Sequence, residues 1–125
     1  MKRLALIVDD NRMIANSLTQ MLNLLGYDVQ AAYGAMMAIQ QMAQRAPDVI
    51  LMDLHMQGLN GIDLCRHLRK DVHLRHIPIL AMSSDNQPAL IQGIREAGAT
   101  LFIPKPIEME ALEKALREIE NLAAQ

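Results

Sequence analysis

The sequence predicts an α/β fold in which a doubly wound parallel sheet of five strands carries helices on both faces. Three observations indicate this fold. Five short, almost entirely apolar runs alternate with five helical stripes, and the connections between them are short. A length of 125 residues fits one domain, so we expect residues 1–125 to form a single unit.

The five apolar runs are the predicted strands. A strand that helices cover on both faces reads as a nearly unbroken series of apolar residues, without the alternation of a half-exposed strand. The runs cover residues 4–8, 29–32, 49–52, 79–82 and 101–103.

The segments between and after these runs are the predicted helices. The first follows residues 9–11, whose Asp-Asp-Asn sequence is typical of a helix start, and Gly26 supplies its stop. Pro88 suits the first turn of the fourth helix, and Gly98 suits its end. The inward-facing stripes include Ile14, Leu18, Met21, Leu22 and Leu25; Ala35, Ala38, Ile39 and Met42; Leu64, Cys65 and Leu68; and Leu112, Ala115, Leu116, Ile119 and Leu122.

Composition excludes several classes of function. The net charge of −2 and an aromatic content of 2% offer neither a basic surface nor stacking platforms, so we expect no direct binding of nucleic acid. No apolar run approaches the ~20 residues of a membrane span, and the run after Lys2 and Arg3 is too short for a signal peptide. The single cysteine, Cys65, fits a reducing compartment. We therefore expect a cytoplasmic protein without membrane contact.

Polar side chains follow four of the predicted strands. Asp9 and Asp10 come after the first strand, Asp53 after the third, Ser83 after the fourth, and Lys105 lies just beyond the fifth. In open parallel sheets, ligands bind at the carboxyl ends of the strands. The sequence therefore predicts that these five side chains converge on one site.

The charge of this predicted site calls for a cation. Carboxylates about 5 Å apart repel by ~3 kcal/mol per pair at an effective dielectric constant of ~20, and Lys105 offsets roughly one such pair. The remaining repulsion is relieved by a proton or by a bound cation. An all-oxygen site rich in carboxylates favours Mg²⁺, and Mn²⁺ is expected to substitute for it.

With a cation bound, one carboxylate can act as a nucleophile toward phosphorus and form an acyl phosphate. Asp53 is the preferred nucleophile because it stands alone at the end of the third strand, whereas Asp9 and Asp10 are better placed to hold metal. Lys105 and Ser83 would bind the other phosphoryl oxygens. Taken singly, each residue has a plainer interpretation, namely a helix cap, a turn residue or a surface lysine.

Together these signals resemble the receiver domain of bacterial two-component response regulators over essentially the whole chain. The acidic pair, the single Asp, the Ser and the Lys-Pro pair at 105–106 follow successive strands at the spacing of that family. The resemblance implies a flavodoxin-like, three-layer (βα)5 sandwich with strand order 2-1-3-4-5. It also implies a signalling phosphoprotein that assists its own phosphorylation and dephosphorylation, rather than an enzyme.

The resemblance assigns roles to individual residues. Asp53 would receive a phosphoryl group from the phosphohistidine of a cognate histidine kinase or histidine phosphotransfer protein. Asp10, Asp53 and the backbone carbonyl of His55 would bind Mg²⁺ directly, with Asp9 assisting through water. Lys105 would pair with the phosphoryl group.

Further residues would form the switch. Ser83 would move toward the phosphoryl group and Phe102 would follow inward, which would change the surface of the fourth helix, fifth strand and fifth helix. A cis peptide bond would precede Pro106. His55 and Asp85 would flank the phosphoryl group and influence its lifetime, although His55 could instead simply face solvent.

Three residues depart from the family pattern. Gln57 stands where the family usually has proline, which would make that loop less rigid. Phe102 lacks the hydroxyl of the commoner tyrosine, which would weaken any partner contact made through it. Pro104 removes a backbone donor at the end of the fifth strand.

Two other classes of protein share part of this pattern. A haloacid-dehalogenase-type phosphatase needs a second acid two residues after the nucleophile, and that position is His55. A degenerate receiver would act as a protein-interaction module without phosphorylation, but the acids and Lys105 are all present. The expected partners are the kinase, an output domain or target protein, and a second copy in a phosphorylation-dependent dimer. No output domain is expected within residues 1–125.

Overall fold

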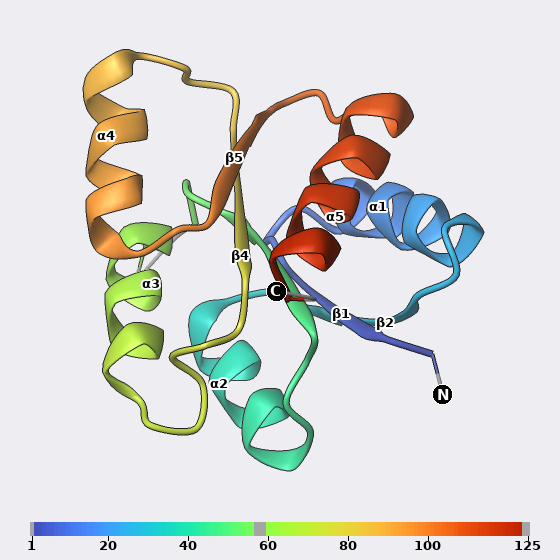
Figure 1. The fold of residues 1–125 in the computed structure, drawn as a ribbon, viewed down its shortest axis with the longest axis horizontal. Helices are drawn as coiled ribbons and strands as arrows, with labels where there is room; N and C mark the ends of the chain where they lie inside the picture. Colours follow the sequence, from blue (N-terminus) through green and yellow to red (C-terminus); the bar gives the residue numbers. More distant parts are fainter. Residues whose placement is uncertain (1, 57–59, 124–125) are drawn as a thin grey trace.

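The structure is a computed structural model that describes residues 2–56 and 60–123. Its centre is a five-stranded sheet of order β2-β1-β3-β4-β5 in which every neighbouring pair of strands is parallel (Figure 1). This topology confirms the predicted fold class and strand order. The strands are β1 (Leu4–Val8), β2 (Asp28–Ala32), β3 (Val49–Asp53), β4 (Ile79–Ser83) and β5 (Leu101–Pro104).

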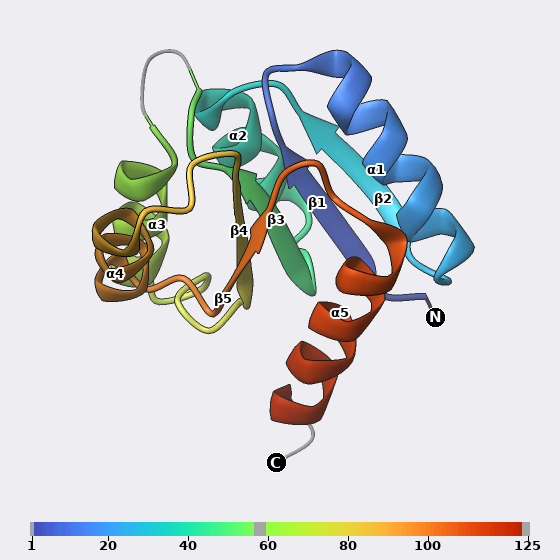
Figure 2. The same ribbon diagram turned by 90° about the horizontal axis from the view of Figure 1, so that it is seen from above.

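Five helices cover the sheet in two layers. Figure 2 shows α1 and α5 on one face and α2, α3 and α4 on the other, which makes the three-layer sandwich. The helices are α1 (Arg12–Leu24), α2 (Ala35–Gln44), α3 (Gly61–Lys70), α4 (Pro88–Ala97) and α5 (Met109–Ala123).

Each face of the sheet has its own apolar core. Along β1, Leu6 and Val8 pack toward the α2 and α3 side, while Ala5 and Ile7 pack toward α1 and α5. This alternation is the period of two that a strand imposes on its side chains. Because both faces are buried, all five residues of β1 are apolar and inaccessible, as the sequence predicted.

The predicted helix ends are confirmed. The Asn11 side chain caps α1 by accepting a hydrogen bond from the backbone N–H of Ile14 at 3.1 Å. Gly98 ends α4 in the left-handed conformation, with φ of 113°, and Pro88 lies in the first turn of the same helix. Gly26 also has a positive φ, 92°, just after α1.

The carboxyl ends of the central strands lie in register, which fixes the residues that follow them. Asp53 at the end of β3 lies opposite Met82, and Ser83 at the end of β4 lies opposite Pro104. The backbone N–H of Lys105 donates to the carbonyl of Ser83 at 2.9 Å. The side chains after β1, β3, β4 and β5 therefore meet at one edge of the sheet.

Gly61, at the start of α3, packs against the backbone of this edge. A Cβ at Gly61 would lie 2.7 Å from the backbone oxygen of Asp53 and 2.8 Å from the Cα of Leu54. Only glycine permits so close an approach. The predicted departure at Gln57 lies outside the described residues.

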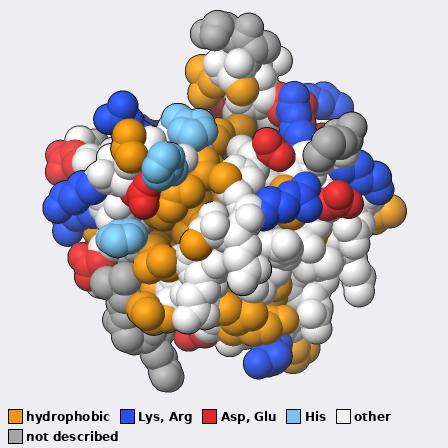
Figure 3. All heavy atoms as spheres, turned by 90° about the horizontal axis from the view of Figure 1, so that it is seen from below, with side chains coloured by type: hydrophobic (Ala, Val, Ile, Leu, Met, Phe, Trp, Pro, Cys, Tyr) orange, Lys and Arg blue, Asp and Glu red, His pale blue; other side chains and the backbone are white. Residues whose placement is uncertain are grey.

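The opposite end of the sheet, where the strands begin, is called the amino edge here, and the end with the carboxylates is called the carboxyl edge. The amino edge carries a groove of about 600 Å³, whose lining includes Tyr27, His76, Pro78 and Ile119. Figure 3 shows hydrophobic side chains exposed beside histidines on one face of the molecule.

None of the described helices has the length and apolar character needed to cross a membrane.

Candidate functional site

Three carboxylates cluster at the carboxyl edge of the sheet. Asp9, Asp10 and Asp53 each offer one oxygen, and these three oxygens lie within 4.8 Å of one another. Asp9 and Asp53 are buried, whereas Asp10 is exposed. Oxygen ligands at this spacing suit a hard divalent cation such as Mg²⁺. The donor set therefore fits the ion that the sequence predicted.

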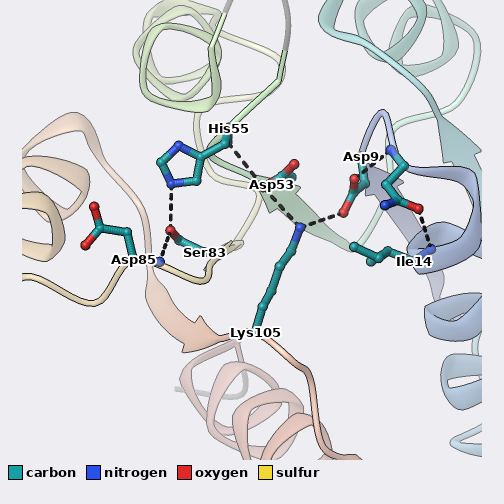
Figure 4. A network of polar contacts seen from close by, with 8 residues as sticks. Asp9, Ile14, Asp53, His55, Ser83, Asp85 and Lys105 are labelled. Atoms are coloured by element: carbon teal, nitrogen blue, oxygen red, sulfur yellow. Dashed lines mark hydrogen bonds and ion pairs between the residues drawn. The ribbon is translucent and has the colours of Figure 1, made fainter.

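Lys105 bridges two of these carboxylates. Its ammonium nitrogen lies 3.0 Å from Asp9 Oδ2 and 3.2 Å from Asp53 Oδ1. Figure 4 shows the ammonium between the two carboxylates. The lysine side chain is 15% exposed, so these contacts are poorly screened by solvent. One ammonium thus faces the two buried carboxylates of Asp9 and Asp53, which leaves one formal negative charge between them.

The pKa of Asp9 reflects its burial first and the neighbouring charges second. Burial raises the pKa of the Asp9 carboxyl above its usual value, and the neighbouring charge of Asp53 raises it further. The backbone N–H of Asn11, which donates to Asp9 Oδ1 at 2.9 Å, and the ammonium of Lys105 both oppose the shift. The rise in pKa prevails, which means that the ionised form of Asp9 is incompletely stabilised by these two groups.

His55, Ser83 and Asp85 form a second group beside the carboxylates. The Ser83 oxygen lies 2.8 Å from His55 Nε2 and accepts a hydrogen bond from the backbone N–H of Asp85 at 2.9 Å. The backbone N–H of His55 donates to Asp53 Oδ1 at 3.2 Å. The resemblance implied that His55 and Asp85 flank the phosphoryl group, but the direct contact of His55 with Ser83 depends on side-chain rotamers that the sequence does not specify.

Phe102 and Pro106 lie on either side of Lys105 in the sequence. Phe102 is half-buried and packs on a small apolar cluster formed by Leu54, Ala81 and Ile94. It therefore lies between the sheet and α4, so a change in its position would alter the packing of that helix. The peptide bond between Lys105 and Pro106 is cis, as the resemblance implied.

A cavity of about 560 Å³ opens over the carboxylates. Its polar wall holds Asp9, Asp10, Asp53 and Lys105. Its apolar wall comes from α1 and from the segment after β5, and includes Ile14, Leu18, Met21, Pro106 and Ile107. The groove at the amino edge is slightly larger, but its lining contains none of the carboxylate cluster. The charged cavity is therefore the candidate functional site.

A doubly wound α/β domain with an acidic cluster and a lysine at the carboxyl ends of its strands is the arrangement expected of a receiver domain. Residues 5–117 match the response regulator receiver domain family. The chain belongs to that family. This finding confirms the family resemblance that the sequence indicated.

Individual relatives agree with this assignment. The chain is 33% identical over 115 residues to the response regulator MprA of Mycobacterium ulcerans, covering 91% of this chain and 48% of MprA. It is 31% identical over 116 residues to the sensory/regulatory protein RpfC of Xanthomonas campestris pv. campestris, covering 91% of this chain and 16% of RpfC. The chain thus spans about half the length of the first relative and much less of the second.

A solved structure shows the same fold. The chemotaxis protein CheY4 of Vibrio cholerae superposes with a TM-score of 0.91 at 27% identity, covering 95% of this chain and 99% of that one. A similarity over nearly the full length of both chains means that the strand order and the helix placement are shared. The carboxyl edge of the sheet is therefore the same topological position in both molecules.

Proposed function

We propose that this chain is a phosphoacceptor switch and that Asp53 is the residue phosphorylated. The observation that carries the proposal is the environment of the Asp53 carboxylate. It ends the central strand, shares a 4.8 Å cluster with two other acids, and lies 3.2 Å from the Lys105 ammonium. Transfer of a phosphoryl group requires a nucleophile and compensating positive charge, and these groups supply both.

In the proposed reaction, a carboxylate oxygen of Asp53 attacks the phosphorus of a phosphohistidine on a histidine kinase or histidine phosphotransfer protein. The new bond joins that oxygen to phosphorus, and the phosphorus–nitrogen bond breaks with its electrons returning to the imidazole. Lys105 would stay paired with a phosphoryl oxygen and neutralise part of its charge.

Asp10, Asp53 and the backbone carbonyl of His55 would hold Mg²⁺, with Asp9 assisting through water. When bound, this ion would supply positive charge next to the phosphoryl oxygens. The other steps depend on side chains of this chain. Asp53 supplies the attacking oxygen, and Lys105 prevents the two buried carboxylates from facing each other uncompensated.

Ser83 and Phe102 would convert phosphorylation into a change of shape. Ser83 would turn toward the phosphoryl group, and Phe102 would move inward against the cluster of Leu54, Ala81 and Ile94, of which Ile94 belongs to α4. The surface of α4, β5 and α5 would then change and present itself to an output domain, a target protein or a second copy of the chain. His55 and Asp85 would influence how fast water removes the phosphoryl group.

The family and its longer members support this role. MprA is named a response regulator and RpfC a sensory/regulatory protein, and both extend well beyond the matched segment. We propose that residues 1–125 act as one receiver unit that controls such an output. Cys65 is free and buried, which agrees with the reducing cytoplasm in which we place this role.

The experiment is incubation with a small-molecule phosphodonor and Mg²⁺, followed by intact mass spectrometry. The wild-type chain should gain the mass of one phosphoryl group, and removal of Mg²⁺ with EDTA should abolish the gain. Asp53→Asn is the matched control, since it keeps the shape of the side chain but removes the nucleophile. No gain in the wild-type chain, together with a folded protein, would favour an interaction module that works without phosphorylation.

A further inference from the structure

The hydroxyl of Ser83 is already engaged on the side away from Lys105. Its oxygen lies 2.8 Å from the Nε2 of His55, and it accepts the backbone N–H of Asp85 at 2.9 Å. Figure 4 shows both contacts on the opposite side of Ser83 from the Lys105 ammonium. Ser83 is completely buried, whereas the His55 residue that contacts it is exposed.

A serine hydroxyl has one proton to donate and two lone pairs with which to accept. The Asp85 N–H occupies one lone pair. Where Nε2 of His55 is unprotonated, it accepts the single hydroxyl proton, which is the same proton that a phosphoryl oxygen would accept. Where Nε2 carries a proton, it occupies the second lone pair and still fixes the oxygen beside the imidazole. In both cases the contact must break before Ser83 can turn toward Asp53.

We propose that His55 is a positioning residue that holds the Ser83 hydroxyl away from the phosphoryl site and so sets how readily the serine responds to phosphorylation. This inference rests on the proposed function, because it assumes that Ser83 moves toward a phosphoryl group on Asp53. It differs from an effect on hydrolysis, since His55 acts here through Ser83 and not on water.

The contact between His55 and Ser83 links the end of β3, which carries the proposed phosphoacceptor, to the end of β4, which carries the serine proposed to respond. His55 follows β3 two residues after Asp53, and its own backbone N–H donates to the Asp53 carboxylate at 3.2 Å. Its side chain reaches across to the end of β4. A single residue is therefore tied by its backbone to the phosphoacceptor and by its imidazole to the switch serine.

The test measures how tightly the protein binds trifluoroberyllate, a tetrahedral analogue of a phosphoryl group, in the presence of saturating Mg²⁺. Isothermal titration calorimetry on the whole chain gives the dissociation constant. His55→Ala should bind the analogue about threefold to tenfold more tightly than the wild type, the range that corresponds to the net value of one hydrogen bond. His55→Gln, whose amide can still reach Ser83, should return the affinity toward that of the wild type.

Two controls make the effect specific. His67→Ala changes another exposed histidine, on α3, and should leave the affinity unchanged. In a Ser83→Ala background, His55→Ala should have no further effect, because the contact it removes is already absent. Circular dichroism melts verify that each variant is folded.

The outcomes separate the two proposals. If the wild type binds the analogue and His55→Ala binds it equally well, the inference is wrong while the phosphoacceptor role stands. An undiminished His55→Ala effect in the Ser83→Ala background would also overturn the inference. Failure of the folded wild type to bind the analogue would overturn the phosphoacceptor role, and the inference with it.

Discussion

The two edges of the sheet differ in how their polar groups are paired. At the amino edge, Arg69 donates from Nε to the carbonyl of Gly98 at 2.8 Å and from Nη1 to the carbonyls of Arg75 and Ile77 at 2.8 and 2.7 Å. At the carboxyl edge, the buried carboxylates of Asp9 and Asp53 share one ammonium, that of Lys105. At the amino edge each of these three carbonyls has a donor, whereas at the carboxyl edge one positive charge faces two buried negative charges.

This difference separates a structural edge from a functional one. Buried polar groups that serve only stability are paired, since an unpaired group costs the full free energy of its desolvation. A cluster that stays unbalanced in the folded chain is suited to a ligand of opposite charge. The contrast therefore predicts that substitutions at the amino edge change stability, whereas substitutions at the carboxyl edge change binding.

The largest expected effect is the loss of Arg69. Arg69→Ala would leave three backbone carbonyls without their donor and detach the end of α4 from the segment before β4, so we expect a loss of roughly 3 kcal/mol in the free energy of unfolding. Urea denaturation measures this loss. Arg66→Ala, in the same helix, is the matched control. It removes an exposed pair with Asp63 at 3.6 Å and should cost less than about 0.5 kcal/mol.

If Arg69→Ala and Arg66→Ala destabilised the protein equally, the carbonyl contacts would contribute nothing beyond the loss of a surface charge. The pairing assigned to the amino edge would then be wrong. Binding of Mg²⁺ should survive in both folded variants, because neither residue lies near the carboxylates.

A smaller effect is expected at Tyr27, which is 5% exposed and donates from its hydroxyl to Glu120 Oε1 at 2.7 Å. Tyr27→Phe should cost about 1 kcal/mol of unfolding free energy at neutral pH. Burial and the charge of Glu120 raise the pKa of Tyr27 from 10.0 to about 12. The folded state therefore holds the phenol proton at a pH where the unfolded chain releases it.

The sign of the pH dependence follows from linkage. The contribution of Tyr27 to stability is complete below pH 10.0 and is lost as the pH rises through about 12. The wild type should thus lose its advantage over Tyr27→Phe across this range, which denaturant titrations at several pH values would reveal. A constant difference between the two proteins from neutral pH to pH 12 would contradict the buried hydrogen bond.

The smallest expected effect lies in α4, the helix that runs from the carboxyl edge to the Arg69 contact. A Cβ at Gly93 would meet no heavy atom within 4 Å. Gly93→Ala should therefore stabilise the protein by roughly 0.5–1 kcal/mol through helix propensity alone. Thermal denaturation measures the gain.

Gly98→Ala is the opposite control in the same region. Gly98 has φ of +113°, and a Cβ there would lie 2.5 Å from the Cγ of Arg69. This substitution should destabilise the protein, since it strains the backbone and displaces the arginine. Stabilisation by Gly98→Ala, or destabilisation by Gly93→Ala, would show that α4 packs differently from the arrangement described.

The sequence predicts the carboxyl edge better than the amino edge. Asp9, Asp53 and Ser83 could be placed because each directly follows an apolar run, and parallel strands bring their ends together. The role of Arg69 could not be predicted, because its acceptors are backbone carbonyls that any sequence provides. The contact between His55 and Ser83 was missed for a related reason. Strand order brings the two residues near each other, but only side-chain rotamers make them touch.

The most direct test of the contrast between the two edges is a calorimetric titration of the metal-free protein with Mg²⁺. The account predicts that the wild type binds one ion, that Asp10→Asn weakens binding by roughly tenfold or more because a carboxylate ligand is lost, and that Tyr27→Phe binds as the wild type does. Absence of Mg²⁺ binding by the folded wild type, or equal affinity in Asp10→Asn, would contradict the claim that the carboxyl edge is built to receive a cation.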